Sequence, residues 1–201
     1  MITIVDYQMG NLRSVQKAFE KNGHQAQITS DPEVVGGAEK LVLPGVGAFA
    51  DCMSELRTRG LVEPICEVVR RGAPFLGICL GLQVLFDVGY EDGTYEGMGL
   101  IPGKVVRFSI PRGYKVPHMG WNTLEVSRRP PILQGVPEGS HFYFDHSYHV
   151  EPTCREVIAA TTPYPDPFCS VIWKDNVFAT QFHPEKSQQF GLKLLDNFAR
   201  L

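Results

Sequence analysis

The sequence predicts an α/β fold, with a single domain over residues 1–201, a mostly parallel open sheet flanked by helices, and antiparallel additions in the C-terminal half. Three observations support this prediction. In the first half, short apolar runs alternate with helical patterns of roughly 10–15 residues, which is typical of right-handed βαβ units. In the second half, short β-rich segments are separated by proline and glycine turns. No linker or internal repeat divides the chain.

The expected strands of the first half are short runs rich in branched apolar residues, at 2–7, 25–30, 40–43 and 74–79. Helical periodicity follows the first of these runs, with an expected helix over 11–22, and the third, with expected helices from about Phe49 to Gly60 and over 61–71. Segment 74–79 is apolar throughout, as expected for a strand in the middle of a parallel sheet, where both faces are buried.

The second half predicts strands at 104–108, 121–126, 141–149, 157–162, 170–173 and 177–182. We interpret them as antiparallel additions followed by a return to the main sheet. A final helix near 188–201 would place Phe190, Leu194, Leu195 and Phe198 on one face.

Composition narrows the class of protein. The formal charge of −3 and pI near 6.1 provide no basic field, which argues against nucleic acid as a partner. No apolar run approaches the roughly 18 residues that span a bilayer, and the first residues do not resemble a signal peptide. The five cysteines include no C-x-x-C pair, which favours free thiols in a reducing compartment. We therefore expect a cytoplasmic protein with no membrane partner.

The most informative segment is a G-x-C-x-G sequence around Cys79, where an apolar strand meets an expected helix. It is the thiol version of a nucleophile elbow, whose flanking glycines, Gly77 and Gly81, allow a turn too tight for a Cβ. The elbow would hold the sulfur in a strained, exposed position at a helix N-terminus, which favours the thiolate. The Leu80 N–H would then point toward a developing oxyanion, and Gln83 would share the helical face of Cys79. The alternative is a buried structural cysteine, which we prefer for Cys52 and Cys66.

A histidine and a carboxylate follow the last expected strand in the sequence His183-Pro184-Glu185. In extended backbone, residues i and i+2 project to the same side, so Glu185 can reach a ring nitrogen of His183. Pro184 favours the extended conformation of the residue before it. The other ring nitrogen is then free to accept the proton of a thiol. The pattern predicts Cys79, His183 and Glu185 as nucleophile, base and orienting carboxylate.

The remaining histidines raise the question of a metal site. His141, His146 and His149 lie close in sequence, but an extended strand places His146 and His149 on opposite sides. The sequence contains no H-E-x-x-H signature, so we expect no metal.

The elbow 77–83 and the segment 183–185 together resemble the motifs of the triad (class I) glutamine amidotransferases. Within that family, the chain is similar to glutaminase subunits that supply ammonia for histidine biosynthesis. The segments that carry this narrower resemblance are Asp6-Tyr7 with Gly10-Asn11-Leu12, residues 43–47, residues 117–122, and Phe142-Tyr143-Phe144 with His146-Ser147-Tyr148. The chain departs from the usual pattern at Gln8, Leu82, Asp145 and 89–91, none of which belongs to the triad.

The resemblance implies a reaction that needs no cofactor. The Cys79 thiolate attacks the side-chain amide of glutamine, His183 gives a proton to departing ammonia, and water hydrolyses the γ-glutamyl thioester. It also implies an oxyanion hole formed by Leu80 and Val46, the latter after a peptide flip in the flexible loop 44–47. This flip would make activity depend on a loaded partner. The implied glutamine-binding residues are Gly45, Gly47, Gln83, Glu91, Ser147 and Tyr148.

A chain that makes ammonia and has no motif for a phosphorylated acceptor implies a second subunit. The resemblance implies that this partner is a (β/α)₈-barrel cyclase in a heterodimer. Trp121, in a Pro/Gly-rich segment unsuited to burial in a helix or sheet, is a candidate interface anchor, with an ordinary half-buried tryptophan as the alternative, and Lys186 is another candidate. Three alternatives remain open: a glutaminase subunit of another biosynthetic amidotransferase, a stand-alone γ-glutamyl hydrolase, and a non-catalytic regulator.

Overall fold

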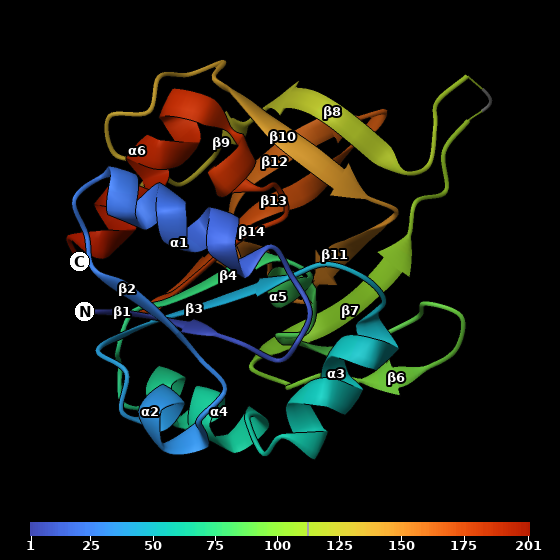
Figure 1. Ribbon diagram of the computed structural model, residues 1–201. Helices are drawn as coiled ribbons and strands as arrows, with labels where there is room; N and C mark the ends of the chain where they lie inside the picture. Colours follow the sequence, from blue (N-terminus) through green and yellow to red (C-terminus); the bar gives the residue numbers. More distant parts are fainter. Residues whose placement is uncertain (112) are drawn as a thin grey trace.

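A twelve-stranded sheet is the centre of the computed structural model, which describes residues 1–111 and 113–201. One half of the sheet is entirely parallel, as the βαβ pattern predicts (Figure 1). Its strands, in spatial order, are β2 (Ala26–Thr29), β1 (Ile2–Val5), β3 (Lys40–Gly45), β4 (Phe75–Cys79) and β14 (Val177–Thr180).

The other half of the sheet is mainly antiparallel. It continues from β14 through β13 (Asp166–Lys174), β11 (Tyr148–Pro152), β7 (Ile101–Arg107), β5 (Phe86–Gly89) and β6 (Tyr95–Glu96). Only β5 and β7 are parallel to each other in this half. Beside β13 lie β12 (Ile158–Tyr164) and β9 (Glu125–Val126), and a separate antiparallel ribbon consists of β8 (His118–Thr123) and β10 (His141–His146). The predicted fold class is therefore confirmed.

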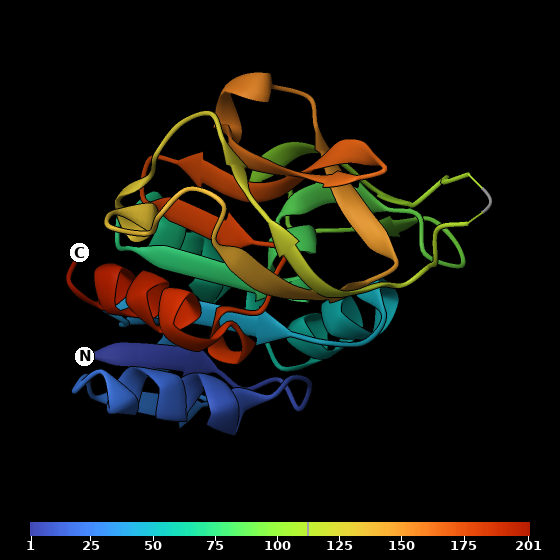
Figure 2. The same ribbon diagram turned by 90° about the horizontal axis from the view of Figure 1, so that it is seen from above.

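Helices cover both faces of the parallel half, and each face has its own hydrophobic core (Figures 1 and 2). On one face lie α1 (Leu12–Lys21) and α6 (Gln188–Ala199), and on the other α2 (Pro32–Gly36), α3 (Phe49–Thr58) and α4 (Val62–Arg70). Strand β4 contributes to both cores, because Phe75 packs on the side of α3 and α4 while Leu76 and Ile78 pack on the side of α1 and α6. Burial on both faces explains why 74–79 is apolar throughout.

Local sequence explains the ends of α1. The Asn11 side chain accepts a hydrogen bond from the backbone N–H of Ser14 at 3.4 Å, as an N-cap does. Gly23, which follows the helix at φ +82°, adopts the left-handed conformation that favours glycine. Gln8 also has a positive φ, of 67°, which is uncommon for a residue other than glycine.

Several expected elements differ from the structure. Expected strand 141–149 is two strands in different sheets, β10 and β11, separated at Ser147, and 121–126 is divided between β8 and β9. The helix after Cys79 is only α5 (Leu80–Gln83), and the chain then enters β5 instead of continuing as a helix. Helix α2 and strands β5 and β6 were not expected, because segments of two to five residues are too short to show periodicity. The remaining short elements are the 3₁₀ turns η1 (Pro131–Leu133), η2 (Arg155–Val157) and η3 (Pro184–Lys186).

The topology brings three chain segments together at one edge of the sheet. Strands β3, β4 and β14 are adjacent and parallel, so their carboxyl ends meet. In an open α/β sheet, ligands bind outside the carboxyl ends of the strands. Gly45 lies directly beside Cys79 in the register of this edge, and β14 leads to His183. Among the residues described, no helix is both long and apolar enough to cross a membrane.

Candidate active site

Cys79 occupies a strained turn at the end of β4. Its backbone has φ 55° and ψ −106°, a combination that non-glycine residues rarely adopt and that requires support from the surrounding structure. Helix α5 begins at the next residue, Leu80, where the first N–H groups have no intrahelical partner. The elbow predicted from the sequence is therefore present.

The flanking glycines have the expected steric role. A Cβ on Gly77 would lie 2.6 Å from the carbonyl oxygen of Gly81, and a Cβ on Gly81 would lie 1.9 Å from that of Leu43. Both distances are far below van der Waals contact, so neither position accepts a side chain without a shift of the backbone. The exposed position expected for the sulfur is wrong, however: Cys79 is only 6% exposed, and the end of β10 lies against it, with the Asp145 carbonyl oxygen 4.0 Å from Sγ.

His183 and Glu185 form the expected pair. The His183 Nδ1–H donates to Glu185 Oε1 at 2.9 Å, and the two side chains are only 3% and 2% exposed. The His183 backbone is also fixed, because its N–H donates to the Tyr143 carbonyl and its carbonyl accepts from the Ser187 hydroxyl. With Nδ1 occupied by the carboxylate, Nε2 is the nitrogen left for chemistry.

The electrostatics of this pair favour a charged imidazole. Burial on its own would lower the pKa of His183, but the Cys79 sulfur and the Glu185 carboxylate both stabilise the imidazolium and raise that pKa to about 10. His183 therefore carries a proton near neutral pH and sits between two groups that are suited to negative charge. A sulfur nucleophile paired with a protonated histidine is the resting arrangement that covalent catalysis by cysteine requires.

A cavity of about 280 Å³ opens onto the sulfur. This volume lies near the lower end of small-molecule sites, which suits a ligand as small as an amino acid. The cavity is lined by Val46, Gly47, Cys79, Leu80, Gln83, Glu91, Pro117, Asp145, His146, Ser147, Tyr148 and His183. The structure thus brings together all the expected site residues of the triad and glutamine site except Gly45 and Glu185, which lie behind the cavity wall.

Gly45 supports the site without lining it. A Cβ on Gly45 would lie 2.3 Å from the Tyr7 hydroxyl oxygen and 2.9 Å from the Leu80 Cβ. The Tyr7 hydroxyl donates to the Pro44 carbonyl at 2.9 Å, so a buried side chain two residues after the end of β1 holds the start of the loop that contains Val46. Gly47, at φ +101°, provides the left-handed turn that leads from this loop into α3.

Glu91 faces the same cavity from the loop after β5. Its Oε2 accepts a hydrogen bond from the Phe49 N–H at 2.8 Å, at the first residue of α3. A carboxylate at a helix N-terminus is favourably placed with respect to the helix dipole. Glu91 is therefore held in position at the cavity by α3.

Sequence reasoning missed Gln181, the last residue before Phe182 and His183. Its Nε2 lies 3.7 Å from Cys79 Sγ, and its Oε1 accepts from Gln83 Nε2 at 3.3 Å. Strand alternation did not indicate this position, because β14 ends at Thr180 and Pro184–Lys186 form a 3₁₀ turn. The Gln83 amide, in addition, donates to the Tyr148 carbonyl at 3.0 Å, so its nitrogen is engaged by the protein.

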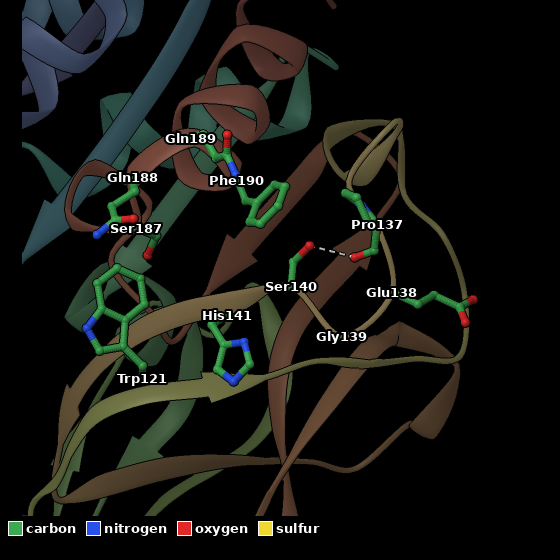
Figure 3. A pocket seen from close by; sticks show the side chains of 10 residues that line it. All are labelled: Trp121, Pro137, Glu138, Gly139, Ser140, His141, Ser187, Gln188, Gln189 and Phe190. Atoms are coloured by element: carbon green, nitrogen blue, oxygen red, sulfur yellow. Dashed lines mark hydrogen bonds between the residues drawn. The ribbon is translucent and has the colours of Figure 1, made fainter.

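The two candidate interface residues lie outside the catalytic cavity. Trp121 belongs to strand β8, at the start of the strand expected over 121–126, and its side chain remains 46% exposed. Its indole packs edge-on against Tyr143, and the Lys186 ammonium lies 5.5 Å from the centroid of the same ring. Figure 3 shows Trp121 at one end of a second cavity, of about 310 Å³, with Glu138 at the other end.

The other four cysteines have no comparable surroundings. Burial raises the pKa of Cys52 to about 12 and raises that of Cys66 as well, in keeping with the structural role expected for both. Cys169 is buried, and burial raises its pKa too, whereas Cys154 is exposed. Only Cys79 combines an elbow, a protonated histidine and a cavity.

Comparison with known proteins agrees with this geometry. The sequence model of the family described as "Glutamine amidotransferase class-I" matches residues 3–200. Relatives described as "Imidazole glycerol phosphate synthase subunit HisH" include those of Syntrophotalea carbinolica, 57% identical over 98% of each chain, and Geobacter sulfurreducens, 56% identical over 100% of this chain and 98% of the relative.

Solved structures support the fold. A chain titled "Crystal structure of glutamine amidotransferase" superposes with a TM-score of 0.77 at 20% identity and covers 100% of both chains. The structure of PurLQS from Thermotoga maritima also gives a TM-score of 0.77, at 19% identity, over 99% of this chain and 97% of that one. On the family match and the identity to its relatives, the chain belongs to the class I glutamine amidotransferase family.

Proposed function

We propose that this chain is the glutaminase subunit of an imidazole glycerol phosphate synthase and that it supplies ammonia to a cyclase subunit in histidine biosynthesis. The observation that carries the proposal is the arrangement of Cys79, His183 and Glu185 around a cavity of amino-acid size. Identities of 50–57% to curated subunits of that synthase support the assignment of the pathway. In this proposal residues 1–201 act as one amidotransferase domain, in the cytoplasm.

In the proposed reaction, the Cys79 thiolate attacks the δ-carbonyl carbon of glutamine. The tetrahedral oxyanion accepts hydrogen bonds from the backbone N–H of Leu80 and, after rotation of its peptide, of Val46. His183 gives its proton to the departing ammonia, which leaves a γ-glutamyl thioester and a neutral imidazole. His183 then removes a proton from water, which attacks the thioester and releases glutamate. No step needs a cofactor.

The substrate's amino-acid end would lie at the far side of the cavity from the sulfur. Both amide hydrogens of Gln83 are engaged, so its Oε1 is the atom available to accept from the substrate ammonium. The Glu91 carboxylate adds negative charge for the same ammonium group, and the Ser147–Tyr148 backbone borders the carboxylate end. Gly47 and Gly45 would shape the loop that contacts the substrate amide.

We propose that a (β/α)₈-barrel cyclase binds over the ribbon formed by β8 and β10 and forms a heterodimer with this chain. Trp121 would be the anchor of this interface. Lys186, which lies in the same η3 turn as Glu185, would be a second contact. An aromatic side chain left half exposed beside a cavity is typical of interface anchors. Binding there would bring the partner close to β10, whose end covers the sulfur.

The test is glutamine turnover by the chain alone, by its complex with the cyclase, and by the complex loaded with acceptor. We expect low turnover alone, high turnover in the loaded complex, and none with Cys79→Ser. Mass spectrometry of the acid-quenched reaction should find a γ-glutamyl adduct on Cys79. Full turnover without any partner would instead indicate a stand-alone hydrolase, and parental turnover by Cys79→Ser would reject the mechanism.

A further inference from the structure

A continuous chain of hydrogen bonds connects strand β8 to the Cys79 sulfur. It begins at Asn122, passes through two buried histidines and the Tyr148 carbonyl, and ends at the paired amides of Gln83 and Gln181. The reaction scheme above uses neither histidine and does not use Gln181. The side chains between Asn122 and Cys79 are all buried, so none of these bonds competes with bulk water.

The histidine half of the chain has only one consistent proton arrangement. His146 Nδ1 lies 2.8 Å from the Tyr148 carbonyl oxygen, which can only accept, so Nδ1 carries the proton and Nε2 is an acceptor. His118 Nδ1, 3.1 Å from that Nε2, must therefore donate. His118 Nε2 is then an acceptor for the Asn122 amide at 3.3 Å.

Burial keeps both histidines neutral, which this arrangement requires. It lowers the pKa of His118 to about 4 and that of His146 to about 3. A charged imidazolium would donate from both nitrogens and would break the chain at its neighbour. Near neutral pH both rings therefore keep one donor and one acceptor.

The hydrogen bonds between the side-chain amides of Gln83 and Gln181 determine which end of Gln181 faces the sulfur. Gln83 Nε2 has two hydrogens, directed at the Tyr148 carbonyl (3.0 Å) and at Gln181 Oε1 (3.3 Å). Because the Gln181 oxygen accepts there, its Nε2 is the end that remains for Cys79 Sγ, at 3.7 Å. Gln181 is completely buried, so no water can replace its N–H at this position.

We propose that Gln181 is a further catalytic residue, whose N–H stabilises negative charge on the Cys79 sulfur, and that His118 and His146 are positioning residues that fix its orientation through the Tyr148 carbonyl and Gln83. A hydrogen bond to a charged acceptor is stronger than one to its neutral form, so the donor favours the thiolate over both the thiol and the thioester. It therefore assists at two points: it raises the fraction of Cys79 present as thiolate before the attack, and it stabilises the sulfur as it leaves on hydrolysis of the thioester. The second role rests on the proposed glutaminase function.

The test measures the protonation state of the Cys79 sulfur independently of glutamine turnover. Alkylation of Cys79 by iodoacetamide is followed by mass spectrometry of its peptide over a range of pH, on the full-length chain alone and in complex with the cyclase. In Gln181→Met, which keeps the side-chain length and removes the donor, we expect Cys79 alkylation near neutral pH to slow by about tenfold and the profile to shift upward by about one pH unit. In the complex, kcat for glutamine should fall with KM nearly unchanged.

Two further variants distinguish this role from a structural one. His118→Phe keeps a ring between Tyr164 and Phe144, on which His118 stacks at 3.9 and 4.8 Å, but removes the donor to His146, so we expect a smaller shift of the same sign. Ser170→Ala removes a buried hydroxyl that donates to the Ala160 carbonyl and takes no part in this chain of hydrogen bonds, while it keeps the backbone carbonyl that accepts from the Gln181 N–H, so it should leave the profile unchanged.

A parental alkylation profile in Gln181→Met, with the fold confirmed by circular dichroism, would overturn the proposal. So would a shift in Ser170→Ala as large as that in Gln181→Met. If the parental complex fails to turn over glutamine, the proposed function is rejected, whereas the alkylation result still decides the role of Gln181.

Discussion

Replacement of Glu185 by glutamine tests the electrostatics of the triad with almost no change in shape. The carboxylate accepts from His183 Nδ1 at 2.9 Å in a site where both side chains are almost fully buried. Together with the sulfur it raises the pKa of His183 to about 10, against a burial effect of the opposite sign. A hydrogen bond to a charged group contributes about 1.5–3 kcal/mol, which corresponds to about one to two pKa units. We therefore expect Glu185→Gln to lower the pKa of His183 to about 8–9.

The matched variant is Cys79→Ala, which removes the other group that stabilises the imidazolium. The sulfur raises the pKa of His183 more than the carboxylate does, so this variant should lower it further than Glu185→Gln. The assay is the pH titration of the His183 ring nitrogens by NMR on chain labelled with ¹⁵N-histidine. A pKa that remains near 10 in both variants, or that rises in either, would refute this account of the charged pair.

Three other changes test the elbow, the interface and the loop. Gly81→Ala would place a Cβ 1.9 Å from a carbonyl oxygen of β3, so we expect it to lower the free energy of unfolding in urea by about 1–3 kcal/mol. The control is Gly36→Ala, whose Cβ has its nearest contact at 3.6 Å and should leave the stability almost unchanged. Equal urea midpoints for the two variants would contradict the predicted clash. Trp121→Ala should weaken coupling to the cyclase far more than it lowers the free energy of unfolding, and unchanged coupling would count against an interface. Tyr7→Phe leaves the buried Pro44 carbonyl without its donor and should cost about 1 kcal/mol by the same unfolding assay; an unchanged midpoint would show that this bond is dispensable.

The parts of the site that depend on local backbone could be predicted from the sequence. The G-x-C-x-G elbow needs only a strand, a tight turn and two positions without a Cβ, all of which the residues themselves specify. The pairing of His183 with Glu185 was also predicted, although for a different reason: extended chain was expected around Pro184, whereas Pro184–Lys186 form a 3₁₀ turn that begins directly after His183. The parallel half of the sheet could also be predicted from the sequence, because its strands are buried on both faces and separated by amphipathic helices.

Long-range contacts could not be predicted in the same way. The hydrogen bond between Gln83 and Gln181 joins residues 98 positions apart, and no local pattern indicates that their amides meet. The burial of Cys79 depends on where the chain turns at Ser147, between two strands that belong to different sheets. The cross-strand pairing of Trp121 with Tyr143, in β8 and β10, is another contact between segments that no local pattern connects.

The position of β14 has a consequence for synthesis of the protein. This strand is synthesised after every other strand of the sheet, yet it lies in the middle of the sheet, between β4 and β13. Until residues 177–180 are available, the nascent chain keeps two unpaired strand edges, which are the usual templates for aggregation. The same insertion delivers His183 to a thiol synthesised about a hundred residues earlier, so an unfinished chain has a nucleophile without its base. Completion of the sheet and acquisition of reactivity are therefore a single event, late in folding.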